Sequence, residues 1–409
     1  MPAPRICCLD LDTFFVSVER VLDPSLEGQP VVVGGRPGTR GVVTACSYEV
    51  RALGVRSGMS LTEAGRLAPD AVYLPVRGDA YGEYVAEVRE IASRYSPVIQ
   101  VASIDELYMD FAGCERLYRT SEDPSDDAAI ERTVHEMTAA IHDELGLPSS
   151  AGIATSRSMA KIGSGLAKPA GVLLVPAGSE AALLAPLPVR KLPGIGPVAE
   201  QKLDRAGLTT LGQVAAMPLA KLRRIFGAWA EHVKDGARGL GSADLSRDRP
   251  AFREHDVAGD SVGSISNERT FRADVGDSAT IESQLCSLCE RVCWRARQRG
   301  VQARTVTLKL RYSNFQTLTR SRTISPTCSE IELYPVIKDL YLGARDGRRR
   351  VRLLGVALSK LGLFDGQLPL FESDRQRDAV VDAIRERFGY DAVRLAGGSR
   401  GGRANVRRD

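Results

Sequence analysis

The pattern of apolar and polar positions predicts an N-terminal region in which short strands and helices alternate. Apolar runs bounded by turn residues predict buried strands, and apolar residues at three- and four-residue spacing predict helices. Ser47 is suited to cap the helix that follows it. The predicted strands are 5–12, 30–34, 40–44, 101–111 and 149–156, and the predicted helices are 47–54, 79–95, 127–146 and 158–167. This alternation indicates an α/β or α+β core.

The pattern changes twice further along the chain. Residues 180–240 predict short helices only, and the polar stretch 241–256 is typical of a linker. A β-α-β-β-α-β order, typical of a split βαβ domain, follows at 262–272, 278–299, 303–311, 316–324, 329–341 and 350–358. Residues 375–393 have a helical pattern, whereas the Gly/Arg-rich 397–409 favours disorder.

Composition excludes several classes of protein. The 409 residues are 43% hydrophobic and 26% charged, which excludes a wholly disordered chain and suggests two to four domains. No apolar stretch is long enough to cross a membrane. Acidic residues follow the N-terminus too closely for a signal peptide, so we expect a cytosolic protein. The eight cysteines are too few for a disulfide scaffold, and Cys286, Cys289 and Cys293 share one helix face, which favours core packing.

Charge is unevenly distributed. The whole chain carries +4, but residues 291–361 hold sixteen basic and four acidic residues. That segment is therefore +12 and the remainder −8. Such a single-sign region indicates a polyanionic partner, with a merely solvated basic surface as the alternative.

Three carboxylates interrupt apolar strands. Asp10 lies at the end of the first predicted strand, and Asp105 and Glu106 lie within another. Buried, clustered carboxylates need a compensating cation, and oxygen ligands suit Mg²⁺. Adjacent strand residues point to opposite faces, so Asp105 and Glu106 require an irregularity or turn to share one ion. Solvated strand-end acids are the alternative.

Five motifs occur in a fixed order: DLDTFFVSVE (10–19), TACSYEVRALGVRSGM (44–59), SIDELYMDF (103–111), GIATSRSMAKIGSGLAKPAG (152–171) and LPGIGPVAEQKL (192–203). Together they resemble the motifs of Y-family translesion DNA polymerases, most closely the DNA polymerase IV branch. The resemblance covers residues 5–361. The mutagenesis-protein branch is the alternative within the family.

The resemblance implies an α+β multidomain, right-hand polymerase without a proofreading exonuclease. Its parts would be a palm (1–20 and 76–167), fingers (21–75), a helical thumb (168–240), a linker (241–256), a β-α-β-β-α-β little finger (257–361) and a clamp-binding segment with a flexible basic tail (362–409). It also implies two Mg²⁺ ions held by Asp10, Asp105, Glu106 and the backbone carbonyl of Leu11. Asp12 is expected to be structural.

By the same resemblance, the incoming dNTP would meet several defined side chains. The triphosphate would contact Thr44, Tyr48, Arg51 and Lys168, which offer hydroxyl, guanidinium and ammonium donors. Phe15 corresponds to the position that excludes a ribose 2′-hydroxyl. Phe14, which we group with the same sugar site, is the better candidate for core packing.

Primer–template DNA and a sliding clamp are the partners that the resemblance implies, for a monomer in a bacterial cytoplasm. LPGIGP opens a helix-hairpin-helix, a sequence-blind phosphate contact. The DNA-binding candidates are Lys191, Gly194, Gly196, Lys202, Arg304, Lys309, Arg311, Arg320 and Arg322. Gln367, Leu368, Leu370 and Phe371, around Pro369, resemble a clamp-binding peptide, with an apolar segment packed on the little finger as the alternative.

Two other functions compete with a polymerase. A nucleotidyl cyclase also uses paired acids and two metals, but it needs neither a helix-hairpin-helix nor a strongly basic module. A non-catalytic relative would bind DNA and the clamp, but such relatives lose the catalytic acids, which are present here.

Overall fold

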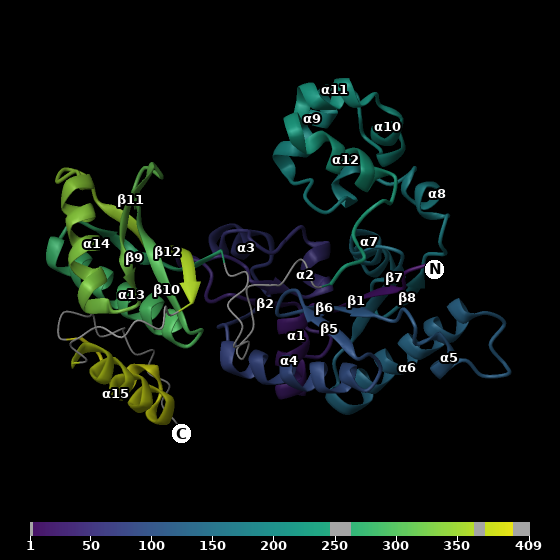
Figure 1. Cartoon of the computed structure of the whole chain (residues 1–409), viewed down its shortest axis with the longest axis horizontal. Coiled ribbons are helices and arrows are strands. Elements are labelled where there is room, and N and C mark those ends of the chain that lie inside the picture. The colour runs from purple at the N-terminus through teal and green to yellow at the C-terminus, as the bar shows by residue number, and fades with distance from the viewer. Residues whose placement is uncertain (1–2, 246–262, 364–372, 396–409) are drawn as a thin grey trace. The chain divides into compact units, whose positions relative to one another are not determined.

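The computed structural model describes residues 3–245, 263–363 and 373–395. The chain forms two compact units, residues 1–252 and 253–409 (Figure 1). No helix among the described residues is both long and apolar enough to cross a membrane.

A five-stranded sheet is the centre of the first unit. Its strand order is β5-β6-β1-β7-β8, with bounds Val98–Val101, Glu106–Asp110, Ile6–Leu11, Ser149–Ala154 and Val172–Leu174. The central strand β1 pairs antiparallel with β6 and β7. The sheet extends past the palm boundary predicted at residue 167, because β8 pairs with β7.

Helices cover both faces of this sheet, and the alternation of strand side chains decides which residue meets which helix. Cys7, Leu9 and Leu11 join the core beneath α1 (Phe14–Leu22), α4 (Gly78–Ser93) and α6 (Asp126–Leu145). Ile6 and Cys8 pack on the opposite side, with α7 (Arg157–Ala167) and the helices that follow it. Because side chains alternate along a strand, Asp10 lies on the α7 side.

Helix α7 packs directly onto β7. A Cβ atom at Gly152 would collide with the backbone of Ala160 and Ser164, and Gly163 faces the Gly152 Cα. The two glycines thus allow helix and strand backbones to touch. This close approach brings the lysines of α7 and of the segment after it to the acidic end of β1.

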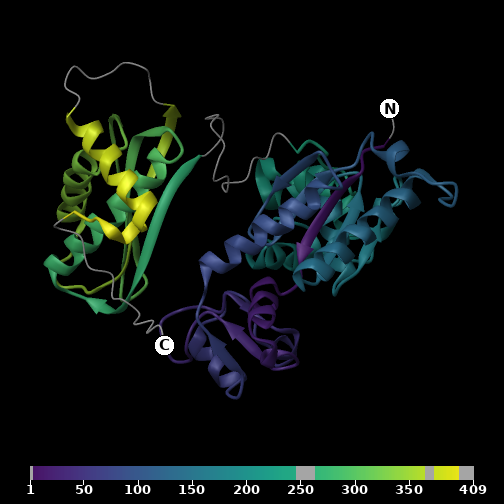
Figure 2. The same ribbon diagram turned by 90° about the horizontal axis from the view of Figure 1, so that it is seen from below.

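A small three-stranded sheet, β3-β2-β4, lies beside the first (Figure 2). Its strands are Ala45–Cys46, Val31–Val33 and Val72–Leu74, and α2 (Tyr48–Ala52) and α3 (Leu61–Leu67) flank them. The strand predicted at 40–44 is therefore displaced, since Val42 forms only an isolated bridge with Ser60. Ser47 precedes α2 as predicted but does not cap it; instead its Oγ accepts a hydrogen bond from Val31 N–H at 3.1 Å.

The region after β8 is helical, as predicted. It contains α8 (Glu180–Leu184), α9 (Pro197–Arg205), α10 (Leu211–Ala216), α11 (Leu219–Phe226) and α12 (Ala230–Ala237). Their apolar residues share one core with Ile6 and Tyr108 of the five-stranded sheet.

The second unit confirms the predicted β-α-β-β-α-β order. Its elements are β9 (Ser264–Val275), α13 (Ser278–Arg297), β10 (Val301–Tyr312), β11 (Thr317–Thr327), α14 (Glu330–Ala344) and β12 (Val351–Leu363), and the strand order is β11-β10-β12-β9. Apolar residues of α13 and α14 pack on one face of the sheet. The three cysteines of α13 are buried and free, which confirms their core role.

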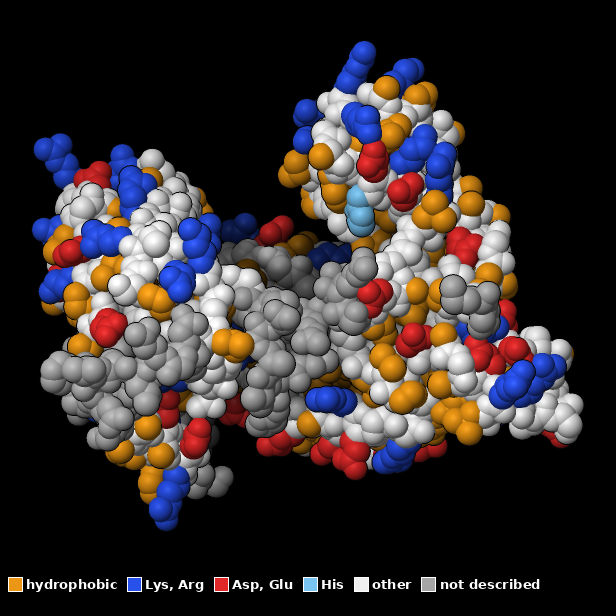
Figure 3. Space-filling view, viewed as in Figure 1, with side chains coloured by type: hydrophobic (Ala, Val, Ile, Leu, Met, Phe, Trp, Pro, Cys, Tyr) orange, Lys and Arg blue, Asp and Glu red, His pale blue; other side chains and the backbone are white. Residues whose placement is uncertain are grey.

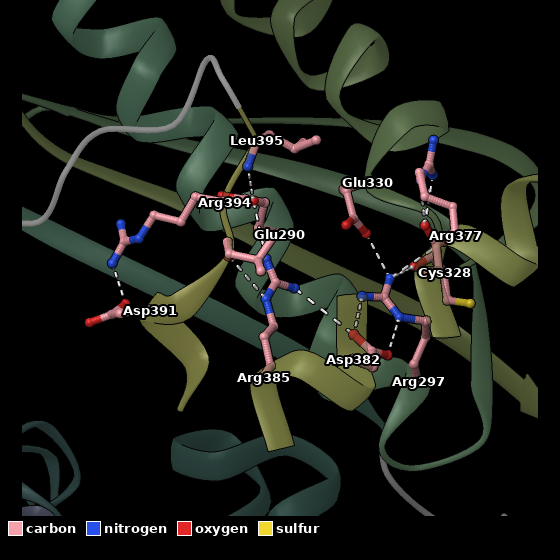
Figure 4. A network of polar contacts seen from close by, with 12 residues as sticks. Glu290, Arg297, Cys328, Glu330, Arg377, Asp382, Arg385, Asp391, Arg394 and Leu395 are labelled. Atoms are coloured by element: carbon pink, nitrogen blue, oxygen red, sulfur yellow. Dashed lines mark hydrogen bonds and ion pairs between the residues drawn. The ribbon is translucent and has the colours of Figure 1, made fainter. Parts of the chain in front are cut away.

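A further helix, α15 (Ser373–Phe388), packs against this unit through charged side chains (Figure 4). Arg385 and Glu290, each 1% exposed, form an ion pair at 3.2 Å. Arg297 of α13 binds Asp382 of α15 at 2.7 Å and Glu330 of α14 at 2.6 Å. These buried ion pairs join the C-terminal extension to the domain, which the sequence pattern did not predict.

Candidate active site

The three predicted metal acids lie at the same end of the five-stranded sheet. Asp10 lies directly opposite Glu106 across β1 and β6. The predicted strand 101–111 is in fact a hairpin, with β5 ending at Val101 and β6 beginning at Glu106. Asp105 lies in the turn, where its carbonyl accepts a hydrogen bond from Leu11 N–H at 2.9 Å. The turn supplies the irregularity that adjacent acids require.

Asp12 is held by the protein itself. Its side chain is 1% exposed. Its Oδ2 accepts hydrogen bonds from Ser150 Oγ and Ala170 N–H, both at 2.7 Å, and its Oδ1 lies 3.0 Å from Lys168 Nζ. These contacts are those expected of a structural acid that fixes the segment after α7 beside β1.

Lys168 bridges Asp12 and Asp10, with its ammonium group on Asp10 Oδ1. Burial raises the pKa of Asp10, and the nearby Lys168 charge opposes that rise. Burial alone would lower the pKa of Lys168, but the attraction of Asp10 and Asp12 outweighs it and leaves the pKa raised. Lys168 is therefore a firmly protonated cation at the edge of the site.

Lys161 is a second cation here, which the sequence analysis missed. Its Nζ contacts Glu106 Oε2. Burial lowers the pKa of Lys161, but its hydrogen bond and attraction to Glu106 prevail, so the pKa is raised overall. Lys168 follows the end of α7 in extended backbone, so helical spacing from Lys168 does not reveal the position of Lys161.

The donor set suits Mg²⁺ in type: three carboxylates and a neighbouring backbone carbonyl, all oxygen, from adjacent strands. Among the residues described, however, no three His, Cys, Asp or Glu side chains converge closely enough to hold an ion. Asp10 and Glu106 each turn an oxygen toward a lysine instead. An ion would have to displace an ammonium group.

A pocket of about 100 Å³ lies beside these acids. Its lining includes most of the residues predicted to bind the nucleotide, namely Phe14, Phe15, Thr44, Arg51 and Lys168. It also includes three of the predicted metal ligands, Asp10, Leu11 and Asp105. Tyr48 is not among its lining residues, but the Arg51 guanidinium lies 5.1 Å from the Tyr48 ring centre. Thr13, Ala45 and Ser57 also line the pocket and were not predicted.

The two phenylalanines line the pocket but differ in their surroundings. Phe14 is buried in the core at 3% exposure. The Phe15 ring stacks on Tyr81 at 4.2 Å between centroids. Tyr81 is fully buried and donates a hydrogen bond to Glu19 at 2.6 Å, so the Phe15 ring has rigid support.

The LPGIGP segment forms the turn before α9. Gly194 has φ +91°, and a Cβ there would press on the Trp229 ring at 3.0 Å. Gly196 directly precedes α9, which begins with Pro197; in its first turn the N–H groups of Val198 and Ala199 have no intrahelical acceptor, which suits them to a phosphate. Lys191 and Lys202 are exposed nearby.

The five basic residues predicted on β10 and β11 do not share one face. Lys309 lies opposite Thr319, and Arg311 opposite Thr317, on the face away from the helices. Arg320 and Arg322 lie opposite the buried Leu308 and Val306, so they point to the helix side, where Arg322 pairs with Asp339 of α14 at 3.3 Å. Arg304 is exposed at a bulge. Figure 3 shows further Lys and Arg side chains gathered over this unit and over α9–α12.

Comparison with known proteins places these features in a family. The impB/mucB/samB family matches residues 9–165, its C-terminal domain matches 262–376, and its helix-hairpin-helix motif matches 177–208. A DNA polymerase IV of Dehalococcoides mccartyi (strain CBDB1) is 36% identical over 96% of this chain and 97% of its own length. One of Desulfatibacillum aliphaticivorans is 38% identical over 95% of both chains.

Solved structures agree. A Y-family DNA polymerase chimera superposes with a TM-score of 0.73 at 26% identity, covering 88% of this chain and 99% of its own. The family models match both units, and the helix-hairpin-helix match lies within the first of them. The chain therefore belongs to the Y family of DNA polymerases, in its DNA polymerase IV branch, with the right-hand fold of that family.

Proposed function

We propose that the protein is a template-directed, error-prone DNA polymerase that performs translesion synthesis by two-metal nucleotidyl transfer. The observation that supports this most is that Asp10, Asp105 and Glu106 lie at one end of the sheet, where Asp10 and Asp105 line a pocket that also contains Arg51 and Lys168. Acids, phosphate-binding cations and a pocket between them are the parts that phosphoryl transfer requires.

In this proposal Asp10, Asp105, Glu106 and the Leu11 carbonyl hold two Mg²⁺ ions, which would lower the pKa of the primer 3′-hydroxyl and neutralise the triphosphate. Arg51, Tyr48 and Thr44 donate hydrogen bonds to phosphate oxygens. Lys168 leaves Asp10 and contacts the triphosphate, whose negative charge replaces that of the carboxylate. Asp12 keeps the Lys168 segment in place throughout.

We assign the palm to 1–20 and 76–174, which includes β8, and keep the other predicted parts: fingers 21–75, a thumb that ends at 240, and a little finger at 257–361. We propose that the protein lacks a proofreading exonuclease. A bacterial cytoplasmic location and a monomeric state accord with this role and remain part of the proposal.

Phe15 is proposed to exclude ribonucleotides by a clash with the 2′-hydroxyl. In Phe15→Ala we expect discrimination between a dNTP and the matching ribonucleotide to fall by about a hundredfold, because the clash disappears while the phosphate contacts remain. Single-nucleotide insertion kinetics with both sugars measure it. Phe15→Tyr serves as the control and should keep the discrimination. Unchanged discrimination in Phe15→Ala would remove Phe15 from this role.

DNA is proposed to lie across the open face of the β9–β12 sheet and on the helical hairpin at Gly194. In a Lys309→Ala/Arg311→Ala variant we expect weaker binding to every sequence, and a salt dependence reduced by about two phosphate contacts. Fluorescence anisotropy on a primer–template over a range of salt concentrations measures both. Lys338→Ala, on α14, is the control. A variant with the wild-type salt slope would contradict this path for the DNA.

A sliding clamp is the proposed protein partner, through Gln367, Leu368, Leu370 and Phe371. These residues lie outside the described residues, so the proposal depends on their sequence alone. A Leu–Phe pair suits an apolar pocket on a partner, and the attachment would raise the local concentration of the enzyme at primer ends.

Primer extension with single nucleotides tests the proposed activity. The purified protein, a labelled primer–template and Mg²⁺ are given one dNTP at a time. We expect addition opposite the complementary base, occasional addition opposite the others, and no shortening of the primer. Shortening would contradict the absence of proofreading, and addition independent of the template would contradict template direction.

A further inference from the structure

Each of the two facing carboxylates at the candidate metal site has its own lysine. Lys168 lies on Asp10 and also reaches Asp12, whereas Lys161 contacts only Glu106 among the ion pairs of this cluster. The Glu106 side chain is 10% exposed and that of Lys161 is 42% exposed. The carboxylate is thus buried, while its cation retains a route to solvent.

The fold places Lys161 there by backbone contact. Lys161 lies on α7 two residues before Gly163, whose backbone faces Gly152 of β7, so this part of the helix is held close to the sheet. Glu106 and Tyr108 lie on the α7 side of β6, as Asp10 does on β1. The Lys161–Glu106 ion pair therefore joins two rigid elements, α7 and β6.

The two lysines have different surroundings. Lys168 lines the pocket together with Arg51, so when it leaves Asp10 it can turn to the phosphates proposed to bind there. Lys161 does not line that pocket. The Lys161 ammonium group neutralises the Glu106 carboxylate. An ion bound to Glu106 would therefore have to displace this ammonium group or lie close to its positive charge.

We propose that Lys161 is an internal counter-ion that competes with divalent cations for Glu106 and so keeps metal binding weak until it is displaced. This inference rests on the proposed function, because it takes Glu106 to be a metal ligand. It assigns Lys161 a positioning role: the lysine holds the carboxylate in place without metal, and its half-exposed ammonium group can move to solvent when a cation arrives.

Titration of the full-length protein with Mn²⁺ alone, without DNA or nucleotide, tests the proposal, with free Mn²⁺ measured by electron paramagnetic resonance. We expect Lys161→Met and Lys161→Gln to bind Mn²⁺ at least about tenfold more tightly than wild type, because a competing charge is removed. Lys161→Arg keeps the charge and should bind weakly, as wild type does. Lys221→Met, an exposed lysine of α11, is the matched control and should not differ from wild type.

A purely structural ion pair gives a different result. Mn²⁺ affinity in folded Lys161→Met and Lys161→Gln that equals or falls below that of wild type would overturn the proposal, and circular dichroism establishes the fold of each variant. A wrong assignment of the metal site gives a third result. If Glu106 and Asp105 are not metal ligands, Glu106→Gln and Asp105→Asn bind Mn²⁺ as tightly as wild type does, whatever the Mn²⁺ affinity of the Lys161 variants.

Discussion

Replacement of Asp105 by asparagine is expected to lower the rate of nucleotide insertion by at least about a thousandfold. Asp105 lies in the β5–β6 turn, where its carbonyl anchors Leu11 and its side chain accepts a hydrogen bond from Ser103. Asparagine keeps the size and the backbone contact but loses the charge that an ion requires. Single-turnover insertion on saturating primer–template measures the effect.

The DNA affinity of this variant should equal that of wild type, because the proposed DNA contacts lie on other elements. Asp110→Asn is the matched control, since Asp110 ends the same strand β6 far from the acid cluster. It should insert nucleotides at the wild-type rate. Insertion by Asp105→Asn within tenfold of wild type would show that this carboxylate is not a metal ligand.

The second large effect concerns stability. Glu290→Gln is expected to destabilise the C-terminal unit by about 3–5 kcal/mol, because it leaves the buried Arg385 charge without its carboxylate. Arg385 is 1% exposed and cannot lose its proton, and its remaining acidic neighbour, Asp382, is 4.0 Å away and already pairs with Arg297 (Figure 4). Glu290 also accepts a hydrogen bond from Leu395 N–H at 2.6 Å, which joins the end of the described chain to α13.

Urea unfolding measures the loss of stability. It is monitored by the fluorescence of Trp294, whose ring centroid lies 5.0 Å from that of Tyr390. A Trp229→Phe background leaves Trp294 as the only tryptophan. The exposed Glu332→Gln of α14 is the control and should change little. A loss below about 1 kcal/mol in Glu290→Gln, the range of an exposed pair, would contradict the buried network.

Replacement of the partner, Arg385→Met, should destabilise the C-terminal unit less than Glu290→Gln does, because Glu290 can become neutral by taking up a proton. Burial already raises the pKa of Glu290, and the Leu395 N–H and Arg385 limit that rise. With Arg385 removed, the folded pKa rises further above the unfolded value. The folded state then binds a proton that the unfolded state does not, so the variant should gain stability as pH falls from about 8 to about 5.

Strong periodicity made most of the fold predictable. The β-α-β-β-α-β order of the second unit follows from long elements, such as β10 with its alternating buried positions. Short strands were less predictable. The strand predicted at 40–44 lies at Ala45–Cys46, because its position depends on pairing with β2, which one segment does not reveal.

The candidate site was predictable in its residues but not in its contacts. The acids and the phosphate-binding set follow from motifs, and most of that set lines one pocket. The hairpin turn at Asp105 was hidden within a continuous apolar pattern. Lys161 was missed because its position over Glu106 depends on the contact between Gly152 and Gly163, which are in different elements. The docking of α15 likewise depends on pairs that are far apart in the sequence, such as Arg297 with Asp382, 85 residues away.

Primer extension by wild type beside an Asp105→Ala/Glu106→Ala variant tests the central claim most directly. Both proteins receive the same labelled primer–template, four dNTPs and Mg²⁺, at concentrations that saturate the DNA. We expect distributive, template-dependent extension by wild type and none by the variant, although both bind the DNA. Wild type that binds the primer–template but adds no nucleotide with any divalent ion would contradict the claim and leave a non-catalytic DNA-binding relative.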